Sequence, residues 1–565
     1  MAPPIATTPP VLQGPSAKEK KYDRQLRLWG ANGQQALESS HILLLNSGAG
    51  VVGVETLKNL VLPGTGTFTI VDEAVVCEED LGVNFFLEQS SLGKSRGEEC
   101  CRLLLELNPE VKGFHIQKTI ADFVKRSDLS QYTLIILVAP VGSLDVASEV
   151  SQIAWDLRQP LIYVHSVGFY SHTSVQLPPS FPIVDTHPDP PSTQDLRLLQ
   201  PWSELLAYAK TQTADLEAFS DHDHGHVPWI LLLLHYLEKW KESHNGEFSV
   251  RDDKKAFREF VGSHARTDNA EGGEENYDEA LTAANRALTL PTIPSDLKSL
   301  LLEEECQIPR NSSANFWLIV NAISTFIKKH SLLPLPGTVP DMKSQSKDYI
   351  ALQSLYRQKS QQDISEVTSN VRALEHALNR HIPIPDAEIS AFCKNAAFVK
   401  LIHGRKLIIN PLKHGWNDNS ITTIIEHTTT MNFVSGKPSL FPILIALYGF
   451  DSAIAAAASV RPESNNLLAA ASASPGFFTL METYIRDVFG KLDSTSEDLD
   501  EALQHTLNIA REIQRSGPGE LHNISSLTGG MIAQEVIKII TKQYVPVDNC
   551  LVFDGIESAS AVYRL

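Results

Sequence analysis

Cysteine is scarce in this sequence, with six among 565 residues, and the six are scattered along the chain. So few thiols do not build a disulfide framework, and their number is typical of proteins in a reducing compartment. A basic excess is missing too, because the formal net charge is −19. That charge argues against nucleic-acid binding over a broad surface and is typical of a soluble protein.

Long apolar runs are missing as well. The most apolar later stretch, residues 441–460, is interrupted by Pro442, Gly449 and Asp451, which argues against a membrane span. Residues 1–19 are rich in proline and lack the charged and apolar regions of a signal peptide, so we expect a disordered tail there. With 565 residues, 42% of them hydrophobic, the chain is long enough for more than one domain.

A glycine-rich turn is the most informative segment present, and the elements around it are arranged in a specific order. That order is an apolar strand at 41–45, the glycines Gly48, Gly50 and Gly53, a helix at 51–62, an apolar strand at 67–71, and Asp72. Such glycines let a phosphate approach the backbone, the helix N-terminus faces its charge, and the acid accepts from a ribose hydroxyl. The segment predicts a Rossmann-like fold, without establishing that a nucleotide binds.

The secondary structure that the sequence predicts changes along the chain. Strand and helix alternate from Lys21 to about Val175, which predicts a doubly wound α/β domain. After Pro178 helical patterns dominate, at 194–211, 228–241, 277–288, 314–330 and 347–379. Residues 453–476, rich in alanine and serine, fit either a helix or a flexible insert.

A predicted alternation of helix and strand returns at the end of the chain. A helix is predicted at 531–542, after two glycines, and a strand at 550–553. We therefore predict one discontinuous α/β domain, residues 20–177 and 395–565, with a large, mainly helical insertion at 178–394.

Three segments resemble the family of ubiquitin-like-protein activating enzymes, which are relatives of the bacterial ThiF-type adenylating proteins. Residues 21–30, KYDRQLRLWG, are similar to the family's opening signature, and residues 55–64, ETLKNLVLPG, resemble the segment after its glycine loop. Residues 533–544 are similar to the closing helix of its regulatory branch in the neddylation (Rub-type) pathway. The middle is supported by Asn395-Ala396-Ala397-Phe398 and by the helix near Tyr349. The resemblance implies a ThiF-type pseudo-adenylation fold in a regulatory subunit of a heterodimeric, ATP-dependent enzyme.

The sequence departs from the family's active members where they hold ATP and magnesium. They carry an Asn-Leu-Asn-Arg-Gln motif, whereas residues 80–86 here are DLGVNFF and the arginine's place falls near Val83. They also carry an acid-rich Asp-Cys-Thr-Asp after the fourth strand, whereas this chain continues to Val141 without a carboxylate. Arg96 replaces a lysine, which is a milder change. Since adenylation needs an arginine clamp and a cation, the resemblance implies a degenerate pocket that binds no magnesium ATP. Its residues are Gly48, Gly50, Gly53, Asp72, Val83 and Val141.

The family's second half-reaction needs a cysteine that is typically followed by threonine. None of the six cysteines here is followed by threonine. We expect them to be buried or neutral thiols, so the chain is expected to hold no catalytic residue and no cofactor of its own.

The resemblance also implies which residues face a partner. Arg24 is expected to reach ATP held by a catalytic subunit, because a guanidinium presents a rigid fork of donors to phosphate. That subunit would bind ATP and magnesium and capture a neddylation-type modifier on its own cysteine, in the cytoplasm and nucleus, with the helical insertion forming part of the catalytic-cysteine region. The expected interface contains Tyr22, Gln25, Arg27 and Trp29, and a helical stripe of Tyr349, Leu352 and Tyr356 that core packing explains equally well.

Two other functions stay open. A stand-alone NAD-dependent oxidoreductase is permitted by the glycine pattern and Asp72, although no catalytic acid–base set is visible. An equivalent subunit for a sumoylation-type modifier fits less well with the length and the helical insertion. The run DHDHGH at 221–226 contains possible metal ligands, but they are too closely spaced to converge on one ion, so we expect no metal site.

Overall fold

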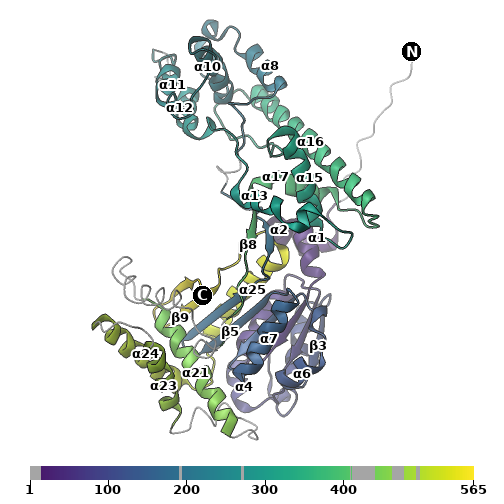
Figure 1. Ribbon diagram of the computed structural model, residues 1–565, viewed down its shortest axis with the longest axis vertical. Coiled ribbons are helices and arrows are strands. Elements are labelled where there is room, and N and C mark those ends of the chain that lie inside the picture. Colours follow the sequence, from purple (N-terminus) through teal and green to yellow (C-terminus); the bar gives the residue numbers. More distant parts are fainter. Residues whose placement is uncertain are drawn as a thin grey trace. The chain divides into compact units, whose positions relative to one another are not determined.

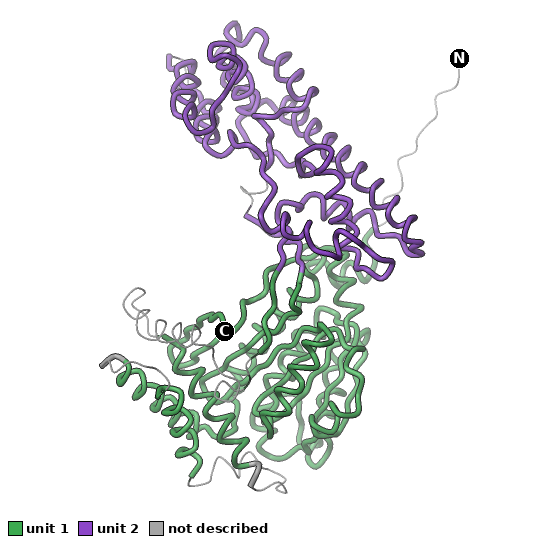
Figure 2. The backbone as a smooth tube through the Cα atoms, in the orientation of Figure 1, with its two compact units in different colours: residues 1–181, 402–565 green, residues 182–401 purple. Residues whose placement is uncertain are grey.

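The structure is a computed structural model that describes residues 14–189, 194–268, 273–407, 409, 439–460, 476–490 and 497–565 (Figure 1). Most of the Ala- and Ser-rich segment at 453–476 lies outside these residues. The chain divides into two compact units, residues 1–181 with 402–565 and residues 182–401, which Figure 2 shows in different colours. The first unit is therefore built from both ends of the sequence.

An eight-stranded sheet forms the centre of the first unit, in the order β10-β9-β6-β5-β4-β1-β2-β3. Its strands are β1 (His41–Leu45), β2 (Thr67–Val71), β3 (Lys112–Ile116), β4 (Leu134–Ala139), β5 (Leu161–Val167), β6 (Tyr170–Gln176), β9 (Cys550–Asp554) and β10 (Ala559–Tyr563). The first five run parallel, whereas β6, β9 and β10 are antiparallel to their neighbours. The C-terminal strand β9 pairs with β6, so both chain ends contribute to one sheet.

Helices cover both faces of this sheet (Figure 1). On one face lie α3 (Val51–Val61), α5 (Arg96–Leu107) and α25 (His522–Thr541), and on the other α6 (Ile120–Arg126), α7 (Leu144–Asp156) and α21 (Phe441–Val460). Two helices pack on α21, namely α23 (Phe477–Gly490) and α24 (Glu497–Ser516). The shorter α1 (Ala17–Lys21) and α4 (Glu78–Val83) and the kinked α2 (Asp23–Glu38) complete the unit. Because both faces are covered, central strands such as β4 are buried throughout, as their continuous apolar sequence predicts.

Helix α25 begins earlier than the predicted start at residue 531, so Gly529 and Gly530 lie inside it. The reason is the close approach of α25 to α3. A Cβ atom on Gly529 would lie 2.9 Å from the backbone nitrogen of Thr56 and 2.9 Å from Cβ of Glu55. Here glycine marks a contact between two helices and not a turn.

The second unit is helical. Its helices are α8 (Ser203–Gln212), α9 (Asp221–His224), α10 (Trp229–Ser243), α11 (Lys254–Gly262), α12 (Glu275–Ala287), α13 (Ser295–Leu302), α14 (Glu304–Gln307), α15 (Asn315–His330), α16 (Ser346–Ala377) and α17 (Asp386–Lys394). The strands β7 (Phe181–Val184) and β8 (Val399–Ile402) form a separate two-stranded sheet. The helix predicted at 194–211 starts only at Ser203, because Pro201 disfavours helix in the residue before it. Over the part of the chain that the structure describes, no helix is both long and apolar enough to span a bilayer.

Two histidines are buried beneath α21, where β5 and β6 pair His165 with His172. The ring of His172 lies 5.6 Å from that of Tyr163 and 5.5 Å from that of Tyr448. Burial, together with the neighbouring His165, lowers the pKa of His172 to about 3. The folded protein therefore holds His172 neutral, whereas the unfolded chain protonates it near a pKa of about 6.5.

This difference predicts how stability depends on pH. The contribution of His172 is fully present above pH 6.5 and is lost as the pH falls towards 3, because only the unfolded state takes up the proton. One pH unit below the unfolded pKa, the loss is about 1.4 kcal/mol. His172→Gln should therefore flatten the fall in unfolding free energy between neutral and mildly acidic pH, measured by urea denaturation. His115→Gln, at an exposed position on β3, is the control, and equal slopes for wild type and His172→Gln would contradict the prediction.

Candidate functional site

The glycine turn lies between β1 and α3, at the carboxyl end of the parallel strands. Gly48 and Gly50 have φ angles of +65° and +70°, which side chains rarely tolerate. A Cβ atom on Gly50 would lie 2.3 Å from Nδ2 of Asn46, and one on Gly53 would lie 2.7 Å from Oδ1 of the same residue. The turn therefore aims the first amides of α3 into the position where a Rossmann-like fold binds phosphate.

Those amides already bind a carboxylate of this chain. Val51 N donates to Oε1 of Glu520 over 3.1 Å, and Val52 N donates to Oε2 over 2.7 Å. The hydroxyl of Ser525 donates to Oε2 over 2.5 Å. Glu520 is only 3% exposed, and burial raises its pKa while these three hydrogen bonds oppose the rise. The carboxyl group of Glu520 therefore lies at the N-terminus of α3, where the helix dipole favours its charged form.

The ribose side of the pocket is also filled from within, by Arg96. Its Nε and Nη2 donate to the two carboxylate oxygens of Asp72 over 2.8 and 3.1 Å. Its Nη1 donates to Oδ1 of Asp80 over 3.1 Å and to the carbonyl of Ala49 over 3.2 Å. Burial opposes the charged form, but the two carboxylates outweigh it and raise the pKa of Arg96. Both oxygens of Asp72 are engaged in this ion pair, so Arg96 does more than replace a lysine.

The remaining predicted pocket residues offer no charge. Val83 is the half-buried last residue of α4, and Val141 is 4% exposed in the core beside α7. Since Glu520, Asp72 and Asp80 all have internal partners, the side chains present do not fit a magnesium nucleotide. No sequence pattern marks Glu520 or Asp80. Glu520 binds the first amides of α3 and Asp80 binds Arg96 only because the fold brings them close to the turn.

The opening signature separates into exposed and buried residues. Arg24 is exposed on α2, Gln25 is half-buried, and Arg27 is exposed with Nη2 3.0 Å from Oδ2 of Asp23. Tyr22 and Trp29 are 2% and 7% exposed. These two aromatic side chains lie in this chain's own core, and their place at a partner interface stays a prediction.

Their polar atoms have internal partners as well. Tyr22 Oη donates to Glu110 over 3.0 Å, and Trp29 Nε1 donates to Gln34 over 3.0 Å. The predicted stripe on α16 is buried to a similar degree. Leu352 and Tyr356 are fully buried, and Tyr356 Oη donates to the carbonyl of Leu196 over 2.8 Å. Tyr349 is half-buried against the same core, so core packing explains the stripe.

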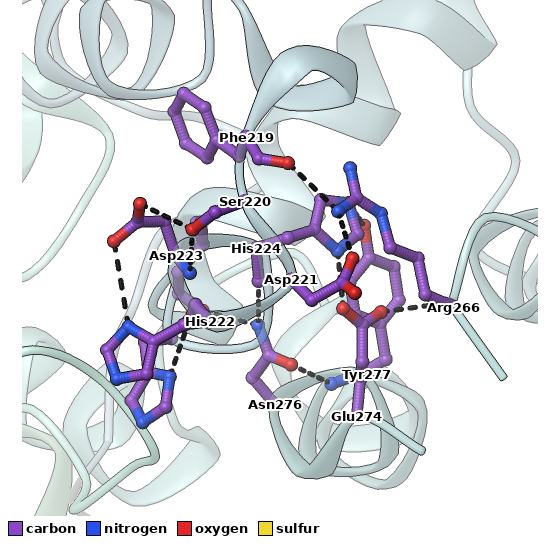
Figure 3. Close-up of polar contacts among 12 residues, drawn as sticks. Phe219, Ser220, Asp221, His222, Asp223, His224, Arg266, Glu274, Asn276 and Tyr277 are labelled. Atoms are coloured by element: carbon purple, nitrogen blue, oxygen red, sulfur yellow. Dashed lines mark hydrogen bonds and ion pairs between the residues drawn. The ribbon is translucent and has the colours of Figure 1, made fainter. Parts of the chain in front are cut away.

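The histidine run at 221–226 forms α9 and the turn after it in the second unit (Figure 3). His224 is 1% exposed, with Nδ1 2.6 Å from Oε1 of Glu274 and Nε2 3.2 Å from Oη of Tyr277. His222 points away from His224 in Figure 3, and its ring stacks on that of His226 with centroids 4.2 Å apart. Within the described ranges, no three His, Cys, Asp or Glu side chains are grouped to hold a metal ion. The run therefore anchors α9 to α12.

The thiols are held in their neutral form. Cys77 is half-buried and the other five cysteines are buried. Burial raises the pKa of Cys77, Cys101 and Cys306 to about 11, and of Cys100, Cys393 and Cys550 to about 12. Because the thiolate is the nucleophile, these values disfavour thioester chemistry at neutral pH.

A family model and several known proteins match nearly the whole chain, and solved structures match part of it. A family model described as the ThiF family matches residues 22–564. The NEDD8-activating enzyme E1 regulatory subunit of Xenopus laevis is 33% identical over 561 residues, which cover 97% of this chain and 99% of that protein. The NEDD8-activating enzyme E1 regulatory subunit AXR1 of Arabidopsis thaliana is 32% identical and covers 96% of each chain. A crystal structure of E. coli MccB with MccA-N7isoASN is 18% identical, with a TM-score of 0.25, and covers 29% of this chain and 48% of that chain.

The ion pairs of Arg96 predict a large stability effect. Arg96→Ala leaves Asp72 and Asp80 buried without their cation, and breaking a buried ion pair costs about 3–5 kcal/mol. We expect that loss in the free energy of unfolding, measured by urea denaturation. Arg102→Ala is the matched control, since Arg102 lies on the same helix with its side chain 47% exposed. Its loss should stay below about 1 kcal/mol, and similar losses for the two variants would contradict the role of Arg96.

Proposed function

Because this chain belongs to the ThiF family, and within it to the NEDD8-activating enzyme E1 regulatory subunits, we propose that it is the non-catalytic half of a heterodimeric activating enzyme. In this proposal the catalytic partner binds ATP and magnesium, adenylates the C-terminal glycine of a neddylation-type modifier and captures it on its own cysteine. The present chain stabilises that partner and completes its ATP pocket, in the cytoplasm and nucleus.

The internal closure of the glycine-loop pocket carries this proposal. Glu520 satisfies the first amides of α3, and Arg96 neutralises the acids that come after β2. A chain with the family's full length but a closed pocket suits a subunit that supports nucleotide chemistry performed elsewhere. The alternative of a stand-alone oxidoreductase loses its main support, because Asp72 has no oxygen free of the ion pair with Arg96.

Arg24 supplies the proposed link to the partner's ATP. Its side chain is exposed on α2, and no ion-pair partner for it exists among the residues described, whereas Arg27 pairs with Asp23. An unpaired guanidinium is free to bind phosphate oxygens with two parallel hydrogen bonds. Gln25 and Arg27 then belong to the surrounding interface.

The helical unit is proposed to form part of the catalytic-cysteine region of the complex. Leu352 and Tyr356 stabilise its interior, so the contact falls to exposed residues of the same helix. Ile350, beside Tyr349, is 59% exposed at the start of α16 and is one such residue.

The role of Arg24 predicts a kinetic effect. One charge-assisted contact to phosphate contributes about 1.5–3 kcal/mol, so Arg24→Ala should slow modifier adenylation about ten- to a hundredfold. Arg24→Lys should recover part of the rate, because an ammonium carries the charge but not the fork. ATP–pyrophosphate exchange by the heterodimer measures the rate.

Gel filtration of the same samples shows whether the two subunits stay associated. Arg27→Ala is the matched control on α2 and should affect exchange less than Arg24→Ala does. Unchanged exchange in an intact Arg24→Ala heterodimer would show that Arg24 has only a structural role.

The raised thiol pKa values predict that this chain never carries the modifier. Replacing Cys77 and Cys101 by serine should leave charging of the catalytic subunit unchanged, because neither thiol ionises at neutral pH. Non-reducing gels of a charging reaction should show a reducible band on the partner alone. Such a band on this chain would contradict the assignment of a non-catalytic role.

A further inference from the structure

The glycine loop keeps the two features with which a Rossmann-like fold holds a phosphate. Its left-handed glycines bring the backbone close to the pocket, and the amides of Val51 and Val52 point at one anion. That anion is the carboxylate of Glu520, which reaches the loop from the segment between α24 and α25, 469 residues further along the chain than Val51. Two carboxylate oxygens on two consecutive amides match the way in which two phosphate oxygens bind there.

A second polar group beside the loop lacks a partner. Asn46 is 4% exposed, and its Nδ2 donates to Asp72 over 2.9 Å, but no described residue donates to its Oδ1. That oxygen lies against the start of α3, 3.0 Å from where a Cβ atom of Gly50 would lie and 2.7 Å from where one of Gly53 would lie. A buried acceptor without a donor costs free energy, and the protonated oxygen of a hydrogen phosphate ion is a donor that would satisfy it.

We propose that Glu520 is an intramolecular ligand that occupies an intact phosphate-binding position, so that this loop retains a latent site for a small phosphate-type anion. The site is closed by competition with Glu520 and not by loss of its donors. The ribose side is closed separately, because Arg96 spans Asp72, Asp80 and the Ala49 carbonyl. Removal of Glu520 therefore admits inorganic phosphate but not ATP.

The charges and hydrogen-bond donors around Glu520 support this proposal. The carboxylate of Glu520 accepts hydrogen bonds from two amides and from the hydroxyl of Ser525, and the charge of Arg96 favours its ionised form without a hydrogen bond. Truncating Glu520 leaves these donors unsatisfied at the positive end of α3, an 11-residue helix. A phosphate ion supplies both the missing acceptors and the missing charge.

Thermal unfolding of the full chain tests the proposal. Glu520→Ala should unfold at a lower temperature than wild type, and sodium phosphate, at ionic strength matched with sodium chloride, should raise its midpoint. The expected rise is about 1–2 °C at a tenfold excess of phosphate over its Kd. Wild type should show no phosphate-specific rise, and isothermal titration should detect phosphate but not ATP on the variant.

Further variants keep the test decisive. Glu520→Ser also leaves room for an anion and retains one acceptor, so it serves if Glu520→Ala does not fold. Glu557→Ala removes an exposed carboxylate from the turn between β9 and β10 and controls for net charge. An equal rise in wild type or Glu557→Ala, or no rise in either Glu520 variant, would overturn the proposal. These measurements use the chain without its partner, so their failure is distinct from failure of the exchange assay.

Discussion

The close approach of α25 to α3 is the constraint on which the first unit depends. Only a residue without a side chain fits at Gly529, where α25 meets Glu55 and Thr56. Glu55 is itself 2% exposed, with Oε1 3.2 Å from Nε2 of His522, the first residue of α25. Because Glu520 lies two positions before that residue, docking of α25 on α3 fixes the carboxylate against the amides of Val51 and Val52. The packing of two helices from opposite chain ends thus closes the pocket.

The charges in the pocket are arranged so that none is left unpaired. Arg96 neutralises Asp72 and Asp80, whereas the charged form of Glu520 is favoured by its hydrogen bonds, by the dipole of α3 and by the nearby charge of Arg96. Burial of a charge is tolerated only with such partners, because water cannot solvate it. The amides of the glycine loop need an acceptor, and Glu520 of the same chain supplies one.

Much of the fold is encoded in local patterns. Apolar runs such as 41–45 and 134–138 become central strands, and the helix expected at 51–62 is α3, because continuous burial leaves a clear signal in sequence. The closure of the pocket could not be predicted in this way, since Glu520 is distant in sequence from the amides that it binds. The signature at 21–30 likewise did not separate buried from exposed positions. Tyr22 and Trp29 lie inward, and only the structure separates them from Arg24.

The thiols, acids and arginines discussed above fall into two sets, those buried within the chain and those exposed on its surface. Buried thiols stay protonated, and Arg96 forms ion pairs with the buried acids Asp72 and Asp80, so these described groups are engaged inside the chain. On α2 the first unit presents the guanidinium of Arg24 to solvent. A fixed cation on the surface has no effect on the internal pocket, but it complements a polyphosphate held by another chain. The polar groups of the glycine-loop pocket are buried and bound to one another, whereas Arg24 is exposed. In the proposed complex, Arg24 is therefore the side chain through which this chain contributes to catalysis by its partner.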